Sequence, residues 1–540
     1  MKSKLNILLA DDLHINVKNF ASFHKFMEKQ GVTVKNINTR RDWITAYGHY
    51  EPMSSVLGER ARLLGKLAAN ELYAYEVKGV NLFKVARAEV LARVVAQPEW
   101  HGAHYPQTSR GIFDRLMEQN KPVLMLGLAA AWDWLEFWTK ALADEKQFTH
   151  ACIFSGSLIY QRSLMELLRF TPTKVMVMES FFTGNDYYCE EKYEPIANNT
   201  NLKHKTVFES LTIDDSADQV DRERMKALNK VVTMNNKNVQ QPETGAPLVF
   251  EHKGKIVTIC GQVVNDFSLL EYRGKGLCSI ALYQELIHDL AANGFNVVFK
   301  AHPWEEKKTN IGRPLTRDAI RDYVAKLPQA LQQRIQVVDH YPIEKLFAMS
   351  HAIAGLNSQS LIEAAFHGFK PIQFGDAFYG KKGFTHDVTP AQVSEVVARL
   401  KQGEWSGTLS LGEYRQFEDF LVTALQRFLV SCHDSGLPRL AQVFEMPTSI
   451  ALLSGKAAKA LVQPTAAPAK PAATHDKPVA AASAKPAAPA PAKPNAEPAP
   501  LHAATGPGPL ERKLLKLRRN PRKFFADSHN GLIRGLRHLF

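Results

Sequence analysis

Residues 295–303 read FNVVFKAHP, and this stretch decides how the second half of the chain is expected to fold. An apolar run leads into Lys300 and His302, and Pro303 follows directly. Because proline has no N–H to donate to a sheet, a buried strand must end here. Two interpretations of His302 stay open on this stretch alone. It ends a strand as a structural hydrogen-bonding residue, or it holds a ligand at the strand's carboxyl end.

Strands and helices alternate on both sides of this stretch. In the second half we expect strands at 255–260, 295–300, 334–339, 351–355 and 371–375, with helices over 279–292, from 343 and over 360–367. In the first half we expect strands at 5–10, 32–37, 122–127, 150–156 and 174–179, with helices over 17–29, after Trp132 and over 161–168. Such alternation predicts an α/β fold with mostly parallel sheets. The sequence therefore predicts two doubly wound, Rossmann-type domains that face a cleft, a GT-B-like plan.

Changes in composition mark the limits of these predicted domains. We place the first Rossmann-like domain at 1–245 and the second at 246–450. The second domain closes with an amphipathic helix over 411–432 that could pack across both halves. Residues 456–509 are mainly Ala, Pro and Lys and cannot bury a core, so a disordered linker is expected there. An amphipathic tail is predicted at 510–540.

The charge is concentrated at the C-terminal end. Of the net charge of +13, residues 456–509 carry +4 (six Lys, two acidic residues) and residues 510–540 carry +7 (nine Lys or Arg, two acidic residues). That leaves +2 for residues 1–455, so the body is nearly neutral and a nucleic-acid partner is not expected.

Several other classes of protein are excluded by missing patterns. No run of about 18 apolar residues occurs, so no transmembrane helix is expected. The five cysteines are scattered without a CxxC pair, which argues against a zinc site or a disulfide framework and favours a reducing compartment. P-loop, G-x-S-x-G, HExxH and G-x-G-x-x-G patterns are absent, so no dinucleotide cofactor is expected.

Serine, lysine and histidine residues gather at predicted strand ends and helix starts of the second half. Ser358 and Ser360 stand where a helix begins, and free N–H groups and hydroxyls there can bind an anion. The alternative is a capping box, since Ser360 and Glu363 fit the pattern S-x-x-E. Lys300 and His302 follow a strand, and ligands of open α/β sheets bind beyond the carboxyl ends of strands. We expect both groups to lie on one sheet edge and to bracket a phosphate.

Two carboxylates also follow predicted strands. Asp266 lies in NDFSLL after the strand at 255–260, where it is either an Asx turn or helix N-cap, or a nucleophile or base that projects into the cleft. Glu179 ends the strand at 174–179, where it is either exposed at the sheet edge or held in the cleft. The sequence alone leaves both pairs of alternatives open.

Three stretches resemble the bacterial capsule-synthesis family of retaining Kdo transferases. KAHP at 300–303 matches the family's K-x-H-P strand end. NSQSLIEAAFHGFKPIQFGDAFYGKKGFT at 357–385 matches its Ser-rich helix start, G-K-P-like step and F-G-x-x-F-Y motif, and GQVVNDFS at 261–268 is similar to its Gln-Val-x-x-Asp-x-Ser stretch. The family usually continues with Ala-Gly-Trp-Gly after F-Y. This sequence has GKKG at 380–383, which leaves the donor sugar and the linkage open.

The resemblance implies a GT-B glycosyltransferase of capsular polysaccharide biosynthesis that uses a CMP-Kdo donor and retains configuration through a carboxylate adduct. The first domain would lie on the acceptor side, and the second would bind the nucleotide sugar. Asp266 would be the nucleophile with Gln262 beside it, and Glu179 is the second predicted catalytic residue. The residues implied near the CMP phosphate and the ribose are Lys300, His302, Ser358, Ser360 and Glu363. Such donors neutralise a leaving phosphate without a metal, so neither a metal nor a cofactor is expected.

The segment 510–540 resembles basic tails of bacterial capsule and O-antigen glycosyltransferases. Leu510, Leu514 and Leu517 recur at helical spacing among Lys and Arg residues, a pattern that suits an anionic membrane surface. A helix that packs on the body or on a partner is the alternative. We expect a cytoplasmic protein, peripheral on the inner face of the cytoplasmic membrane. Its expected partners are a nucleotide sugar, a polysaccharide or glycolipid acceptor, and a polysaccharide-assembly complex.

The preferred function is transfer of Kdo, or a related acid sugar, from a CMP-sugar donor to a cell-surface polysaccharide or its lipid-linked precursor. Two alternatives stay open. A CDP-glycerol-type polyol phosphotransferase also uses His-Pro and Ser-helix elements. A non-catalytic, membrane-tethered scaffold of a capsule assembly complex would not need these residues at strand ends.

Overall fold

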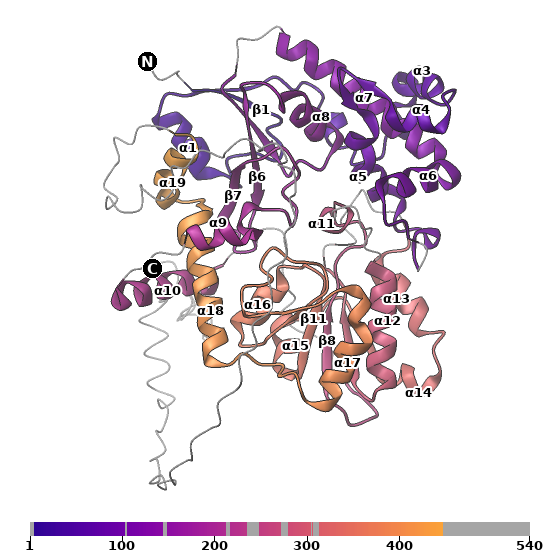
Figure 1. The fold of residues 1–540 in the computed structure, drawn as a ribbon, viewed down its shortest axis with the longest axis vertical. Helices are drawn as coiled ribbons and strands as arrows, with labels where there is room; N and C mark the ends of the chain where they lie inside the picture. Colours follow the sequence, from indigo (N-terminus) through magenta and orange to yellow (C-terminus); the bar gives the residue numbers. More distant parts are fainter. Residues whose placement is uncertain are drawn as a thin grey trace, which may run out of the picture. The chain divides into compact units, whose positions relative to one another are not determined.

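The computed structural model describes residues 5–102, 105–143, 148–211, 216–234, 248–271, 279–303, 305 and 313–445, and all of them belong to one compact unit. Two six-stranded sheets organise this unit (Figure 1), so the predicted α/β fold with mainly parallel sheets is confirmed. The domain limits at 245 and 246 stay predictions. The predicted linker at 456–509 and tail at 510–540 lie outside the described residues.

The first sheet has the strand order β14-β7-β6-β5-β1-β2. Its strands are β1 (Asn6–Leu9), β2 (Thr33–Asn36), β5 (His150–Phe154), β6 (Lys174–Ser180), β7 (Asp186–Glu191) and β14 (Val430–Ser431). β1, β2, β5 and β6 are parallel, whereas β7 runs antiparallel to β6, and β14 runs antiparallel to β7. Alternate residues of β1 face opposite layers. Ile7 and Leu9 pack with α1 (Ala21–Lys29) and α19 (Leu437–Val443), and Leu8 packs on the other face.

That other face carries a layer of helices. Its helices are α2 (Arg41–Ile44), α3 (Ser54–Leu64), α4 (Ala69–Ala74), α5 (Leu82–Val94), α6 (Ser109–Gln119), α7 (Lys121–Ala143) and α8 (Ile159–Leu168), with a small hairpin of β3 (Glu76–Val77) and β4 (Val80–Asn81). The predicted strand at 122–127 is wrong, because this run lies inside α7. Helix α7 is covered by α3, α5 and α8, so its apolar residues show no clear one-sided period, and a short apolar run cannot distinguish a buried helix from a buried strand.

The second sheet has the order β10-β9-β8-β11-β12-β13, and all its pairs are parallel. Its strands are β8 (Ile256–Cys260), β9 (Asn296–Lys300), β10 (Ile335–Val338), β11 (Ala352–Gly355), β12 (Ile372–Gln373) and β13 (His386–Asp387). Its helices are α12 (Ser279–Ala292), α13 (Thr316–Val324), α14 (Gln329–Gln332), α15 (Ile343–Met349), α16 (Ser360–Phe366) and α17 (Val393–Gln402). The five strands predicted in this half are confirmed, and so are the helices predicted over 279–292, from 343 and over 360–367.

The remaining helices join the two halves. They are α9 (Lys205–Ser210), α10 (Ala217–Val232), α11 (Phe267–Leu270) and α18 (Leu411–Val422), and α18 continues as a π-helix over Thr423–Phe428. The predicted single helix over 411–432 is wrong at its end, because Val430 and Ser431 form β14 and pair with β7 of the first sheet. Helix α18 contacts both α10 and α16, so the chain returns along it from the second sheet to the first.

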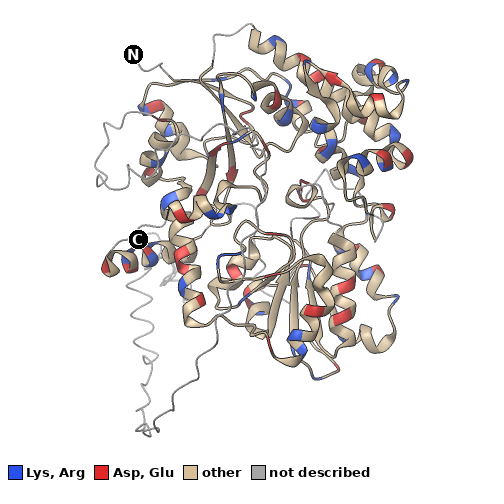
Figure 2. Cartoon of the chain, viewed as in Figure 1, with Lys and Arg blue, Asp and Glu red and all other residues tan. Residues whose placement is uncertain are grey.

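Charge and apolarity in the structure agree with the composition. Lys and Arg are interspersed with Asp and Glu over the helices of both halves (Figure 2). Among the described residues, no helix combines the length and the apolarity that a membrane crossing requires.

Candidate active site

The carboxyl ends of three neighbouring strands in the second sheet place the predicted residues on one edge. In the pairing of β8 with its neighbours, Cys260 lies opposite Lys300 on β9 and opposite Gly355 on β11. The loops and the helix start that follow these strands carry Gln262, Asp266, His302, Ser358 and Ser360. Because β8 separates β9 from β11, the ends of those two strands lie about two strand spacings, ~10 Å, apart.

Gln262 connects the loop after β8 to the loop after β11. Its side chain is buried, and its Oε1 accepts a hydrogen bond from the backbone N–H of Asn357 at 3.0 Å. Its Nε2 donates to Asn357 Oδ1 at 2.7 Å and to Ser268 Oγ at 3.2 Å. Both ends of the amide are therefore occupied, so Gln262 fixes the shape of the site.

Asp266 is the N-cap of α11. Its Oδ1 accepts a hydrogen bond from the backbone N–H of Ser268 at 2.9 Å, so the structural alternative weighed from the sequence is realised. Its Oδ2 has a longer contact of 3.5 Å to Gln262 Nε2. Asp266 is half-buried, and the cap fixes its side chain while Oδ2 stays weakly bonded.

Within the sheet, Lys300 on β9 lies on one side of Cys260 on β8, and Ser358 and Ser360, which follow β11, lie on the other side. The Lys300 ammonium donates hydrogen bonds to the carbonyl oxygens of Ala301, at 3.2 Å, and Asp339, and burial lowers its pKa to about 8. The Cys260 thiol is hydrogen bonded with Ser360 and interacts electrostatically with Lys300. The expected bracket around a phosphate is thus divided between the β9 end and the β11 end. His302 belongs to the β9 side, where it lines a narrow cleft with Arg317 and His340.

Ser358 and Ser360 form a local pair at the start of α16. Their hydroxyl oxygens are 2.8 Å apart, and the backbone N–H of Ser360 donates to Ser358 Oγ at 3.3 Å. The capping-box interpretation of Ser360 and Glu363 is wrong, because Gln359 is the N-cap residue and α16 has no side-chain cap bond. Glu363 is half-buried one turn into the helix, and its pKa is raised to about 7 by burial and by the charge of Glu344.

The pKa of Glu179, at the end of β6, depends on charges from both halves of the chain. Burial raises its pKa to about 7, against the lowering effects of hydrogen bonds from the Ser180 N–H and the Ser155 hydroxyl. The charge of His14 also lowers this pKa, and the charge of Asp266 raises it. Of the two interpretations of Glu179, the one that holds it in the cleft fits this environment, because Asp266 belongs to the other half of the chain.

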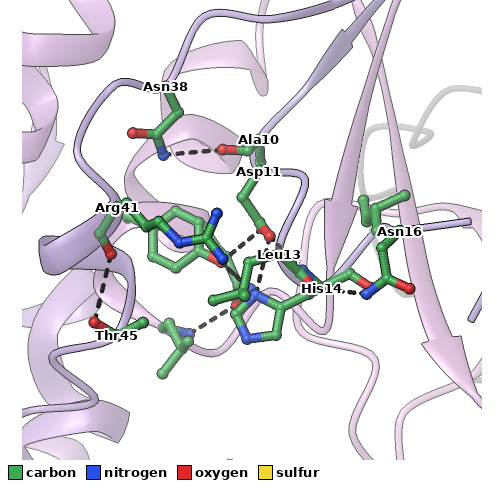
Figure 3. A network of polar contacts seen from close by, with 12 residues as sticks. Ala10, Asp11, Leu13, His14, Asn16, Asn38, Arg41 and Thr45 are labelled. Carbon is green, nitrogen blue, oxygen red and sulfur yellow. Dashed lines mark hydrogen bonds and ion pairs between the residues drawn. The ribbon is translucent and has the colours of Figure 1, made fainter. Parts of the chain in front are cut away.

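The sequence reasoning missed a network at the end of β1, which Figure 3 shows. Asp11 is fully buried. Its Oδ1 accepts a hydrogen bond from the backbone N–H of His14 at 2.7 Å and lies 3.0 Å from Nδ1 of the His14 ring. The Tyr160 hydroxyl donates to Asp11 Oδ2 at 2.7 Å. Burial alone would raise the pKa of Asp11, but its bonds to His14 and Tyr160 and the charge of His14 hold it below its ordinary value.

The network fixes the His14 imidazole. Its Nε2 lies 3.1 Å from the Tyr47 hydroxyl, and its ring stacks on Phe154 with centroids 5.1 Å apart. The signal was present in the sequence. Asp11 and His14 follow the apolar run LNILLA, just as Lys300 and His302 follow the apolar run FNVVF. The rule that ligands bind beyond carboxyl strand ends applies equally to both stretches.

Contacts between the halves complete the site. The backbone N–H of Phe182, in the β6–β7 turn, donates to Gln359 Oε1 at 3.0 Å, and Asn265 Nδ2 donates to the Ala92 carbonyl at 3.1 Å. A cavity of about 720 Å³ opens beside these contacts, with Ser268 in its wall. The arrangement offers a fixed carboxylate, a second carboxylate that exchanges protons near neutral pH, and a carboxylate-bound histidine.

Comparisons with known proteins bear on the second half. Residues 210–404 match the sequence model of the family described as capsule polysaccharide biosynthesis protein, so the resemblance to the capsule-synthesis family is confirmed for this part of the chain. No curated protein matches the chain.

Two solved structures from Thermosulfurimonas dismutans are similar at low identity. The KpsC beta-Kdo 2,4 transferase is 17% identical, with 51% of this chain and 79% of that chain covered and a TM-score of 0.35. The KpsC beta-Kdo 2,7 transferase is 14% identical, with 55% and 82% covered and a TM-score of 0.32.

Proposed function

Because residues 210–404 match the capsule polysaccharide biosynthesis family, we propose that the chain is a glycosyltransferase that moves Kdo, or a related acid sugar, from a CMP-sugar donor to a cell-surface polysaccharide or its lipid-linked precursor. The proposal includes a GT-B arrangement, with one sheet in each half. One observation supports it: the charge of Asp266, after β8 of the second sheet, raises the pKa of the Glu179 carboxyl at the end of β6 of the first sheet.

In the proposed reaction Asp266 is the nucleophile. Its Oδ2 bonds to the anomeric carbon of the sugar, the bond from that carbon to the phosphate oxygen breaks, and CMP leaves with the electron pair. An acceptor hydroxyl then attacks the same carbon and displaces Asp266, so two inversions give retention. Glu179 takes the proton of that hydroxyl, a role that suits a carboxyl with a pKa of about 7.

The residues around these carboxyls have supporting roles in the proposal. Lys300 and the Ser358–Ser360 pair stabilise the negative charge that develops on the leaving phosphate. Glu363 and His302 contact the nucleotide. Asp11 orients the His14 imidazole toward Glu179 and balances its charge when it is protonated. No metal or cofactor has a role in this scheme, and that stays a prediction.

Intact-mass analysis after incubation with CMP-Kdo tests the proposal. We expect CMP release and a mass increase of one Kdo residue, absent in Asp266→Asn and present in Asp434→Asn, whose carboxyl is exposed and pairs with Lys25. Glu179→Gln should form the adduct but pass it on slowly. If wild-type protein gives neither adduct, CMP release nor transfer, the proposal is wrong. Turnover of CDP-glycerol instead would identify the phosphotransferase, and unchanged capsule synthesis in cells carrying Asp266→Asn would identify the scaffold.

A further inference from the structure

The cavity beside the site is lined from both halves of the chain. Helices α5 and α8 carry basic residues toward it, whereas Ser268, Glu271 and Asp376 come from the second half. Five Lys or Arg residues and four acidic residues line it in all. Ser268 is two residues after the proposed nucleophile Asp266, so the cavity extends to the position where an acceptor would stand.

Two arginines in this cavity share a single carboxylate oxygen. Arg87 on α5 and Arg162 on α8 each donate one hydrogen bond to Glu271 Oε2, and both bonds are 3.3 Å long. The three side chains are 18%, 9% and 8% exposed, so little water reaches them. The other oxygen of Glu271, Oε1, is buried and has no hydrogen-bond partner within the described part of the chain.

Two bonds of 3.3 Å to one shared oxygen are long and incomplete for an ion pair with so little exposure to water. Two buried guanidinium groups have ten N–H donors between them, and one carboxylate cannot neutralise both charges. A guanidinium normally meets a carboxylate through bonds of about 2.7–2.9 Å, often in a bidentate fork. The arginine pair therefore has a positive charge and donors in excess of what Glu271 supplies.

A second ion pair in the same cavity wall shows the contrast. Glu166 accepts two hydrogen bonds from Arg169, at 2.9 and 2.8 Å, and one from Lys84 at 2.8 Å. Both carboxylate oxygens of Glu166 are satisfied, as expected of a purely structural pair. The long, one-sided bonds of Glu271 are thus a local property of the Arg87–Arg162 pair.

We propose that Arg87 and Arg162 bind an anionic group of the acceptor, a sugar carboxylate or a phosphate, and that Glu271 occupies the place of this anion when no acceptor is bound. That this anion belongs to an acceptor rests on the proposed function, whereas the binding of an anion by the arginine pair does not. Asp266 and Glu271 flank the four-residue helix α11, so they lie about 7–8 Å apart along its axis. An acceptor anchored at the arginine pair would present a hydroxyl near Asp266 and Glu179.

Ligand-observed NMR titration of the full chain, with CMP present to occupy the donor site, tests this inference. The probes are the methyl glycoside of Kdo, its carboxyl-reduced neutral analogue, and glycerol phosphate. The variants are Arg162→Gln, Arg87→Gln and Glu271→Gln, with Arg110→Gln as the matched control, because Arg110 forms an exposed pair with Asp114. The basic tail is present in every sample, so its contribution cancels between variants.

We expect at least one of the two charged probes, the methyl glycoside of Kdo or glycerol phosphate, to bind at least 10-fold more tightly than the neutral analogue. Arg162→Gln and Arg87→Gln should weaken its binding about 10- to 100-fold, because each removes a charged hydrogen bond. Glu271→Gln removes the competing charge at nearly constant shape and should tighten binding several-fold. Preference for the Kdo glycoside over glycerol phosphate identifies a sugar carboxylate, and the reverse identifies a phosphate.

Equal binding of the neutral analogue, or weaker binding in Glu271→Gln, would show that the three residues are only a structural link between the halves. Thermal unfolding of each variant confirms that it is folded, and Glu271→Gln decides the question even if an arginine variant is unstable. Adduct formation from CMP-Kdo does not require the arginine pair. A chain that forms the adduct without this anion binding refutes the inference alone, and one that binds the anion without forming the adduct refutes the proposed function alone.

Discussion

Glu179→Gln is expected to stabilise the protein at alkaline pH while it slows the proposed transfer step. The folded protein holds the Glu179 pKa at about 7, whereas an unfolded chain returns it to 4.5. Between these values the folded state binds more protons, so Glu179 lowers the stability progressively as the pH rises from about 4.5 to about 7. Glutamine has no charge to desolvate and avoids this loss.

The size of the effect follows from the pKa difference. Each pKa unit corresponds to about 1.4 kcal/mol, so the full difference would reach ~3 kcal/mol above pH 7. Glu179 is half-buried and keeps some contact with water, so we expect a gain of about 1–2 kcal/mol. For a chain of this size, that gain corresponds to a rise in Tm of about 1–2 °C.

Thermal unfolding at pH 5 and pH 8 measures this effect, with Glu166→Gln as the control of opposite sign. Burial would raise the Glu166 pKa, but its bonds to Arg169 and Lys84 hold it below the ordinary value. Its contribution is therefore present above its ordinary pKa and is lost as the pH falls, so Glu166→Gln should destabilise at pH 8 by about 1–3 kcal/mol. A Glu179→Gln protein that gains nothing at pH 8, or gains equally at pH 5, would refute the burial argument.

Other predictions rest on single contacts. Gln262→Ala should lower the free energy of unfolding by about 2–4 kcal/mol, measured by urea denaturation, because it leaves the buried Asn357 N–H without a partner. His14→Ala should slow transfer about 10- to 100-fold without weakening CMP binding, and equal loss of both would contradict its placement beside Glu179. CMP-sugar binding should weaken as the pH rises through about 8, where Lys300 loses its charge, and this step near pH 8 should be absent in Lys300→Met. A chain that ends at residue 509 should lose co-sedimentation with anionic vesicles, since residues 510–540 carry +7 (nine Lys or Arg, two acidic residues).

The second sheet was readily predicted because its sequence signals are local. Each of the five strands from β8 to β12 is a short apolar run bounded by charged residues, glycine or proline, and the helix over 279–292 has the predicted bounds. The prediction of the first half failed where burial on several sides of a helix removed the one-sided period of its apolar residues. In α7, a side chain on Gly127 would come 2.3 Å from Val90 Cγ2, and this close contact with α5 is invisible in a run that reads as an apolar strand. Strand β14 was missed because its partner β7 lies more than 230 residues earlier.

The candidate site shows where local reasoning ends. Strand ends selected Asp266, Lys300 and Glu179, but the sequence could not show which of them face one another. Gln262, predicted beside the nucleophile, contacts Asp266 Oδ2 at 3.5 Å. Its shorter hydrogen bonds go to Asn357 and Ser268, two partners that the sequence did not indicate. These partners could not be predicted, because the orientation of a side chain after a strand depends on the loop that meets it from elsewhere in the chain.

Burial explains why Glu179 keeps a destabilising environment. Hydrogen bonds satisfy Asp11 and Glu166 well enough to lower their pKa values, so the fold is able to stabilise buried carboxylates. At Glu179 the pKa stays raised, because burial outweighs all the contributions that lower it, including the charge of His14. A carboxyl whose pKa stays near 7 can both take and give a proton at physiological pH. The same property that lowers stability above pH 7 is the one that the proposed transfer to an acceptor hydroxyl requires, so a gain in stability and a loss of transfer should appear together in Glu179→Gln.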